Sequence, residues 1–254
     1  MKVSVLASGS KGNSTFIDFF SFIALVDVGI SFKNINKKIE SLNYIGEKID
    51  YVFLTHIHDD HVLGLKQTLK KTNCKVILTK KMHEDIKEIL PLERTIYIED
   101  ELMIKDVKIT ALKGSHDSGE VVFYIFERKG IEIAYVTDTG YINVNNFSKL
   151  KNKDLYLFES NHDIELLMNG KYPHYLKQRV ISDEGHLSND MASKYLCDFI
   201  GEKTKYIILF HLSENNNTPD LALSTLKKGL LKNNKKVEKI MVSTYEECTE
   251  LVEL

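Results

Sequence analysis

The 254-residue sequence has no tryptophan, only three prolines and only three cysteines. The cysteines (Cys74, Cys197 and Cys248) are far apart and odd in number, which argues against a disulfide framework or a cysteine zinc site. Neither sign of charge dominates, because the formal net charge is −2, so no general attraction to nucleic acid or anionic membranes is expected. Because no run of about 18 apolar residues and no signal-peptide pattern occurs, we predict a cytoplasmic protein without a membrane span.

What is present indicates an ordinary globular chain, with 43% hydrophobic and 28% charged residues. Short apolar runs predict strands in each half of the chain, and apolar residues spaced three and four apart predict helices after them. The predicted strands cover 3–6, 14–19, 22–26, 51–55, 75–79, 107–112, 121–127, 131–136, 155–158, 206–210 and 239–242. The predicted helices cover 32–42, 61–69, 80–90, 162–168, 188–200 and 219–231.

This repeated order of sheet and then helices predicts an α/β fold, an αββα sandwich of two mixed sheets with helices on both outer faces. No long Gly/Ser/Pro linker divides the chain. We therefore expect residues 1–254 to form a single domain of two pseudo-symmetric halves that share one core.

Three of the nine histidines fall in one hexapeptide, HIHDDH, directly after the predicted strand 51–55. His56 and His58 lie two residues apart in an extended segment, so both side chains point the same way and can bind one cation. Asp60 and His61 follow in a turn and can face a neighbouring cation. The cluster therefore predicts two metal ions.

Further candidate ligands follow other predicted strands, where a rigid sheet would hold them in place. His116, Asp138 and His211 each come shortly after an apolar strand. A carboxylate has two oxygens, so Asp138 can bridge two cations. Asp27 ends the strand 22–26, and we expect it to orient the histidines rather than to bind metal.

The motifs HIHDDH, GSHDSG, VTDTG and LFHLS, in this order, resemble those of the metallo-β-lactamase superfamily along essentially the whole chain. The resemblance implies a first metal site of His56, His58 and His116, a second site of Asp60, His61 and His211, and Asp138 as the bridge. It also implies that water or hydroxide between the metals is the nucleophile, with Asp60 among the catalytic residues. Zn²⁺ or Mn²⁺ suits these ligands, and Fe is also compatible.

Four further segments resemble the YycJ/WalJ (VicX) family of metal-dependent hydrolases: LASGSKGNST, LFESNHD, SDEGHLS and FHLSENNNTP. They are also similar to tRNase Z, whose proton-donating Glu and His match Glu159 and His186. A departing sugar oxygen needs a proton, and an imidazolium held by a carboxylate can supply it. His186 could instead be only a neighbour of the helix cap at Ser188.

Two segments are candidates for substrate contact. In the glycine-rich SGSKGNS segment, Ser10 and Asn13 could bind a phosphate, although such a segment can also be only a turn. In NGKYPHYLKQR, basic and aromatic residues alternate, and Lys177 and Arg179 could bind DNA phosphates. A solvated helix face would show the same charges.

The family resemblance implies a metal-dependent phosphodiesterase or exonuclease whose substrate is nucleic acid, DNA rather than RNA. One alternative is a small-molecule phosphodiesterase or thioesterase on the same fold, which would not need the basic aromatic segment. A second alternative is tRNase Z-like RNA processing. The chain lacks a Gly/Pro-rich tRNA-binding arm, and this absence argues against a tRNA substrate. The third alternative is a non-catalytic binding module that metal only stabilises. The loss of a metal ligand would favour it, but all the ligands of the set are present.

Overall fold

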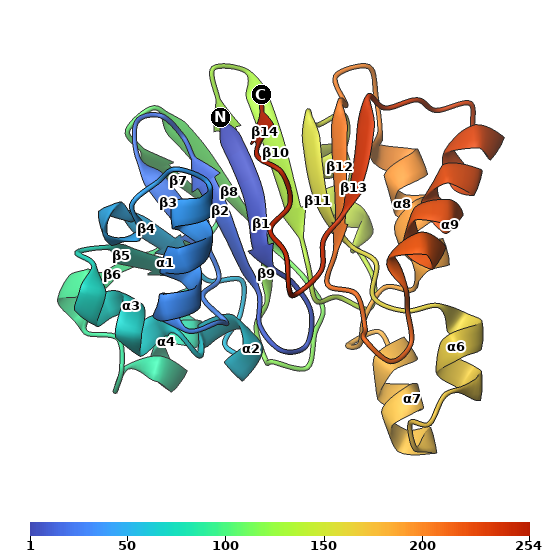
Figure 1. The fold of residues 1–254 in the computed structure, drawn as a ribbon, viewed down its shortest axis with the longest axis horizontal. Helices are drawn as coiled ribbons and strands as arrows, with labels where there is room; N and C mark the ends of the chain where they lie inside the picture. The colour runs from blue at the N-terminus through green and yellow to red at the C-terminus, as the bar shows by residue number, and fades with distance from the viewer. The chain divides into compact units, whose positions relative to one another are not determined.

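The structure is a computed structural model that describes residues 1–254, and its chain forms two compact units (Figure 1). Unit 1 comprises Met1–Ala111 together with Tyr245–Leu254, and unit 2 comprises Leu112–Thr244. Each unit is described by itself, and the expectation of a single domain with one shared core stays a prediction. None of the helices is both long enough and apolar enough to cross a bilayer.

The first sheet belongs to unit 1 and begins with three antiparallel strands, as their alternating and β-branched sequence predicts. Parallel strands then extend it, and the last strand of the chain pairs with the first. Its order is β14-β1-β2-β3-β4-β5-β6. The strands are β1 (Lys2–Ala7), β2 (Ser14–Asp18), β3 (Ile23–Val26), β4 (Tyr51–Phe53), β5 (Lys75–Leu78), β6 (Thr95–Tyr97) and β14 (Val252–Glu253).

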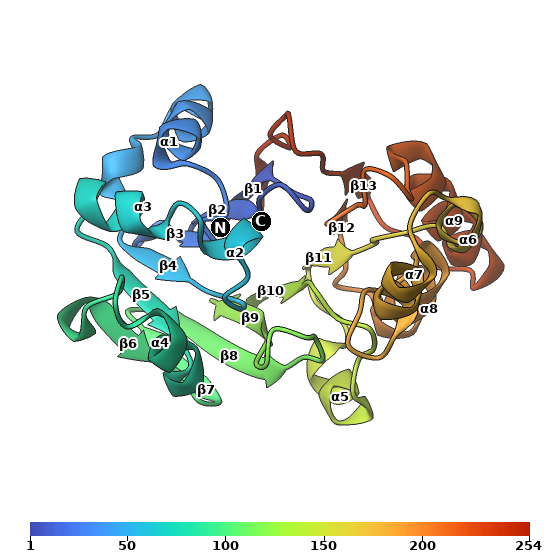
Figure 2. The ribbon, with the colours of Figure 1, turned by 90° about the horizontal axis from the view of Figure 1, so that it is seen from below.

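The helices of unit 1 connect these strands, and α1 and α3 lie on the same side of the sheet (Figure 2). Helix α1 buries Phe32, Ile35 and Ile39, the residues whose spacing predicted it, and the Ser31 hydroxyl accepts a hydrogen bond from the Asn34 amide at its start. The helices are α1 (Phe32–Ser41), α2 (Asp59–Val62), α3 (Leu65–Lys71) and α4 (Lys80–Ile86), with the short 3₁₀ helices η1 (Gly46–Lys48) and η2 (Leu92–Arg94).

The second sheet has the order β13-β12-β11-β10-β9-β8-β7, antiparallel at its β7–β8 and β9–β10 pairs and parallel from β10 to β13. In the β9–β10 turn Lys129 and Gly130 both have positive φ, as a tight hairpin requires. The strands are β7 (Glu101–Ile104), β8 (Val107–Lys113), β9 (Val122–Arg128), β10 (Ile131–Val136), β11 (Leu155–Glu159), β12 (Tyr206–Phe210) and β13 (Lys239–Val242).

In unit 2, helices α8 and α9 pack against each other beside β12 and β13 (Figure 1). Their apolar sides join a buried cluster that includes Phe158, Leu196 and Leu226. Helices α6 and α7 lie together at one end of this unit, and α7 has no buried residue. The helices are η3 (Val144–Asn146), α5 (Phe147–Leu150), α6 (Ile164–Asn169), α7 (His174–Ile181), α8 (Asn189–Phe199) and α9 (Pro219–Lys232).

Three predicted helices differ from the structure by two residues or more, and one of them, predicted over 80–90, ends at Ile86 as α4. The helix predicted over 61–69 is divided into α2 and α3 at Gly64, where a side-chain Cβ would lie 2.1 Å from the Ile30 carbonyl oxygen. The helix predicted from His162 begins at Ile164 instead, because the Asp163 carboxylate accepts a hydrogen bond from the Leu166 amide as its cap. His162 lies in an isolated bridge with Ser188.

Candidate metal-binding and catalytic site

The HIHDDH motif follows β4 in unit 1 and brings its three histidines together. The ring centroids of His56 and His61 are 4.0 Å apart, and those of His56 and His58 are 4.8 Å apart. The Asp60 carboxylate lies 3.6 Å from His61 Nε2. Imidazole and carboxylate donors of this kind suit a divalent transition metal.

Asp27 is fully buried beside this cluster and binds two of its neighbours. Its Oδ2 lies 2.8 Å from His61 Nδ1, and the Thr55 amide and hydroxyl donate to its two oxygens at 2.9 Å and 2.8 Å. Burial raises the pKa of the Asp27 carboxyl, and His61 and the hydrogen bonds oppose that rise. Asp27 thus touches His61 in the way an orienting carboxylate would.

The glycine-rich SGSKGNS segment lies against the same cluster in unit 1. The Asn13 side chain is buried and exchanges hydrogen bonds with the Gly9 backbone, and its Nδ2 lies 3.0 Å from His61 Nε2. The backbone amide of Asn13 also donates to the Asp60 carbonyl oxygen at 2.7 Å. Ser10 is exposed at the tip of this segment. The structure therefore shows Asn13 supporting the predicted metal-ligand cluster, and its contact with a phosphate stays a prediction.

Asp138, Glu159, His186 and His211 converge in unit 2, with one ligand atom of each within 4.8 Å of the others. Glu159 Oε1 lies 2.7 Å from His186 Nδ1 and 3.1 Å from His211 Nδ1, and His211 Nε2 lies 3.3 Å from Asp138 Oδ1. The Thr139 amide donates to the other Glu159 oxygen at 3.0 Å. Glu159 therefore holds both imidazoles from the Nδ1 side.

The acidity of Glu159 follows from these contacts. Burial alone would raise the pKa of its carboxyl, but the charge of His186 and the hydrogen bonds from both histidines hold the pKa below its ordinary value. Glu159 is therefore an anion at neutral pH.

His116 follows β8 and is held through the backbone. Its Nδ1 lies 3.0 Å from the Gly185 carbonyl oxygen. Burial lowers the pKa of His116, so the neutral imidazole is favoured. A neutral ring that donates through Nδ1 offers the lone pair of Nε2 to a cation.

The same orientation recurs at three of the predicted metal ligands. Nδ1 of His61 meets a carboxylate, Nδ1 of His211 meets a carboxylate, and Nδ1 of His116 meets a carbonyl oxygen. Metal-binding histidines in proteins are held in this way almost without exception, because the second bond fixes the tautomer and aims Nε2. The donor sets of both units thus fit divalent metal ions.

Comparison with known proteins identifies the family of this chain. Residues 25–211 match the family model of the β-lactamase superfamily domain. The chain is 34% identical to exodeoxyribonuclease YycJ of Bacillus anthracis, over 89% of this chain and 88% of that protein. It is also 34% identical to exodeoxyribonuclease WalJ of Streptococcus pneumoniae serotype 2, over 90% of this chain and 88% of that protein. The chain belongs to the YycJ/WalJ family of the β-lactamase superfamily.

Solved structures of the superfamily share the fold of this YycJ/WalJ family member. The metallo-β-lactamase fold protein YhfI from Bacillus subtilis has a TM-score of 0.74 at 17% identity, covering 98% of each chain. The short form of human tRNase Z has a TM-score of 0.68 at 14% identity, covering 100% of this chain and 99% of that chain. These structures confirm the predicted fold class. The family model and the two relatives confirm the predicted family, and the chain is an enzyme, a metal-dependent hydrolase.

The basic aromatic segment of this YycJ/WalJ family member forms α7 and the turn before it. Lys177 Nζ donates to the Met168 carbonyl oxygen at 2.6 Å, at the end of α6. Arg179 Nε donates to Asp117 Oδ2 at 2.5 Å. Contact of either residue with a substrate stays a prediction, and the structure shows Arg179 paired with an acidic residue beside His116.

Several supporting groups could not be found from the sequence. Thr55, Thr139 and Gly185 hold site residues through a hydroxyl, an amide and a carbonyl group, and such contacts have no motif of their own. His162 was part of the quoted motif LFESNHD, but it was assigned to a helix. It is buried near Glu159 and His186, and burial lowers its pKa to about 4.

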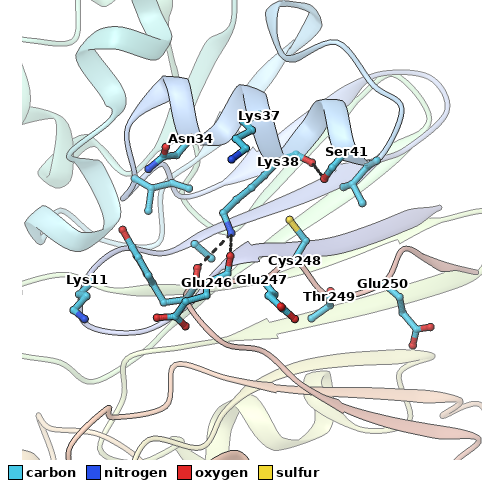
Figure 3. A pocket seen from close by; sticks show the side chains of 14 residues that line it. Lys11, Asn34, Lys37, Lys38, Ser41, Glu246, Glu247, Cys248, Thr249 and Glu250 are labelled. Carbon is cyan, nitrogen blue, oxygen red and sulfur yellow. Dashed lines mark hydrogen bonds between the residues drawn. The ribbon is translucent and has the colours of Figure 1, made fainter.

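A separate pocket of about 850 Å³ in unit 1 contains none of the predicted site residues. It is lined by α1, Lys11 and the segment Tyr245–Glu250 (Figure 3). Lys38 reaches across it and donates to the carbonyl oxygens of Tyr245 and Glu246 at 3.3 Å and 2.8 Å. Lys38 therefore ties the C-terminal segment to α1.

Proposed function

We propose that this hydrolase is a phosphodiesterase that removes nucleotides from an end of DNA. The Glu159–His186 pair beside Asp138 and His211 is the observation that carries the proposal, because a diester with a sugar leaving group needs an acid next to the metal ligands. The names of the relatives, which are exodeoxyribonucleases, support DNA as the substrate.

We further propose that two divalent ions are held by the seven predicted ligands: His56, His58 and His116 for the first, Asp60, His61 and His211 for the second, with Asp138 shared. Zn²⁺ and Mn²⁺ are the proposed ions. When bound, such ions lower the pKa of a coordinated water and offset the charge of the phosphate. The chain's own carboxylate and carbonyl groups orient the metal-binding histidines, and His186 donates a proton.

In this proposal His186 is the general acid. Its Nδ1 is held by Glu159, so Nε2 faces away from the carboxylate and can donate a proton to the leaving oxygen. As the bond between phosphorus and this oxygen breaks, the oxygen takes the His186 proton and departs as an alcohol, and water supplies the new oxygen on phosphorus. Glu159 keeps the His186 ring in place before and after it gives up the proton. In the proposal Ser10, Asn13 and Lys177 contact the substrate phosphates.

The test is metal analysis of the purified protein, followed by incubation with each metal and three substrates: end-labelled DNA, end-labelled RNA and bis-p-nitrophenyl phosphate. We expect about two metal ions per chain, stepwise loss of nucleotides from DNA and slower cleavage of the small diester. Degradation of RNA in preference to DNA would point to tRNase Z-like processing. Turnover of the small diester with neither nucleic acid cleaved would favour a small-molecule phosphodiesterase.

A further inference from the structure

Helix α7 in unit 2 lies largely at the surface, yet two predicted site residues are held by the turn that follows it. The helix has no buried residue, so apolar packing contributes little to keeping it in place. Its C-terminal end continues into the turn 182–186, which ends at His186. The position of α7 therefore decides the position of this turn.

The turn is tied tightly to the last residues of α7. The His186 amide donates to the Val180 carbonyl oxygen at 2.9 Å, and the Ser182 hydroxyl donates to the Arg179 carbonyl oxygen at 2.8 Å. A Cβ at Gly185 would lie 2.2 Å from the Val180 carbonyl oxygen, so only glycine allows this close approach. The turn and the end of α7 thus behave as one piece.

This piece contacts the site residues at two points. The Gly185 carbonyl oxygen accepts from His116 Nδ1 at 3.0 Å, and His186 Nδ1 lies 2.7 Å from Glu159. A shift of α7 would therefore disturb a predicted metal ligand and the predicted acid together.

One charged side chain fixes α7 to the segment that carries His116. Arg179 Nε donates to Asp117 at 2.5 Å, and Asp117 directly follows His116. The bond with Asp117 raises the pKa of the Arg179 guanidinium. The Arg179 side chain is 57% exposed, and an exposed pair of this kind adds little to overall stability.

We propose that Arg179 is a positioning residue: through Asp117 it holds α7 and the turn 182–186 in the place where Gly185 orients His116 and Glu159 holds His186. From the sequence, Arg179 was predicted to contact the substrate. A substrate contact and a positioning residue predict different effects of removing the Arg179 side chain. The inference rests on the proposed function for only one of its readouts, the hydrolysis of a diester.

The test compares Arg179→Ala with Gln178→Ala, which removes an exposed side chain from the same helix. In the metal-free full-length protein, we expect the amides of residues 180–187 to exchange with solvent several-fold faster in Arg179→Ala and at the wild-type rate in Gln178→Ala. Metal affinity, measured by competition with a chelator, should fall about 2- to 5-fold in Arg179→Ala, which is as much as the loss of one exposed ion pair can contribute.

On bis-p-nitrophenyl phosphate, kcat of Arg179→Ala should fall by a similar factor while KM stays unchanged. Asp117→Asn should reproduce these effects. The metal affinity and kcat of the double variant should be no lower than those of the more impaired single variant, because both changes break the same interaction. Arg179→Lys keeps the charge and should recover part of the loss.

Unchanged exchange and metal affinity in Arg179→Ala, with a loss confined to DNA, would overturn the inference and make Arg179 a substrate contact. If the wild-type protein cleaves no diester with any metal, the proposed function fails. The exchange and metal-affinity measurements then still decide whether Arg179 positions the turn.

Discussion

Three site residues adopt a backbone conformation that most residues avoid. Asp27, Asp138 and His211 have φ angles of 59°, 50° and 58°, and each closely follows a strand. A left-handed residue at a strand end turns the chain sharply and redirects its side chain, at a cost of about 1–3 kcal/mol each. Hydrogen bonds such as Thr55 to Asp27 and Asn161 to the His211 carbonyl oxygen hold these conformations.

Asp27→Asn should loosen metal binding without abolishing it. The amide keeps the size of the side chain but loses the charge that holds His61 Nδ1, so His61 is oriented less well. We expect affinity to fall about 10- to 100-fold, measured by chelator competition. A variant with wild-type affinity would show that Asp27 does not orient His61.

His186→Ala should affect substrates according to their leaving groups. An alkoxide needs a proton to depart and p-nitrophenolate hardly does, so cleavage of DNA should fall by about 10²- to 10⁴-fold and cleavage of a p-nitrophenyl diester much less. Glu159→Gln should show the same selectivity in milder form, because the imidazole remains but is held less well. Equal losses on both substrates, with both metals still bound, would contradict the role of His186 as an acid.

At the scale of elements, one cluster of charges joins β10 to the segments at 152–154 and 203. Glu132 accepts from Lys153 Nζ at 2.5 Å and from Lys203 Nζ at 2.9 Å. Burial acts to raise the pKa of the Glu132 carboxyl, but the bonds and charges of the two lysines outweigh it and hold the pKa below its ordinary value of 4.5.

Because the folded pKa of Glu132 is lowered, its stabilisation is fully present above pH 4.5 and is lost as the pH falls through the folded value. Glu132→Gln should therefore lower the free energy of unfolding by about 1 kcal/mol at pH 7. The difference between the two proteins should shrink as the pH falls below 4.5, which urea unfolding at several pH values would measure. A difference that is constant with pH would exclude this electrostatic origin.

Elements with strong apolar periodicity were predictable, and elements shaped by distant contacts were not. The spacing of Phe32, Ile35 and Ile39 predicted α1 because these side chains face the core. Helix α7 has no buried face, so its sequence could indicate only a charged segment. In the same way, HIHDDH indicated a candidate metal-ligand cluster, but no pattern showed that the Gly185 carbonyl oxygen would hold His116.

At the scale of the whole molecule, unit 1 is completed by the C-terminal segment. Strand β14 pairs with β1, the Ser4 hydroxyl donates to the Thr249 carbonyl oxygen at 2.7 Å, and the Val5 amide donates to the Thr249 hydroxyl at 2.9 Å. All three contacts join residues separated by more than 240 positions. The last residues of the chain therefore stabilise the first strand.

Thr249→Val should lower the free energy of unfolding by about 1–3 kcal/mol, because the buried Val5 amide loses its acceptor while the shape of the side chain is kept. Thr249→Ser retains the hydroxyl and serves as the control, which should stay closer to wild type. Urea unfolding of the metal-free proteins would measure both. Equal stability of Thr249→Val and wild type would mean that water replaces the lost bond.

The first and last residues of the chain lie side by side, which would allow the chain to be circularly permuted. The Met1 amino group donates to the Leu254 carbonyl oxygen at 2.9 Å, so a short linker could join the two ends. A circular permutant opened between Thr244 and Tyr245 would then run through the whole of unit 1 before entering unit 2. Each unit would then be one uninterrupted stretch of sequence.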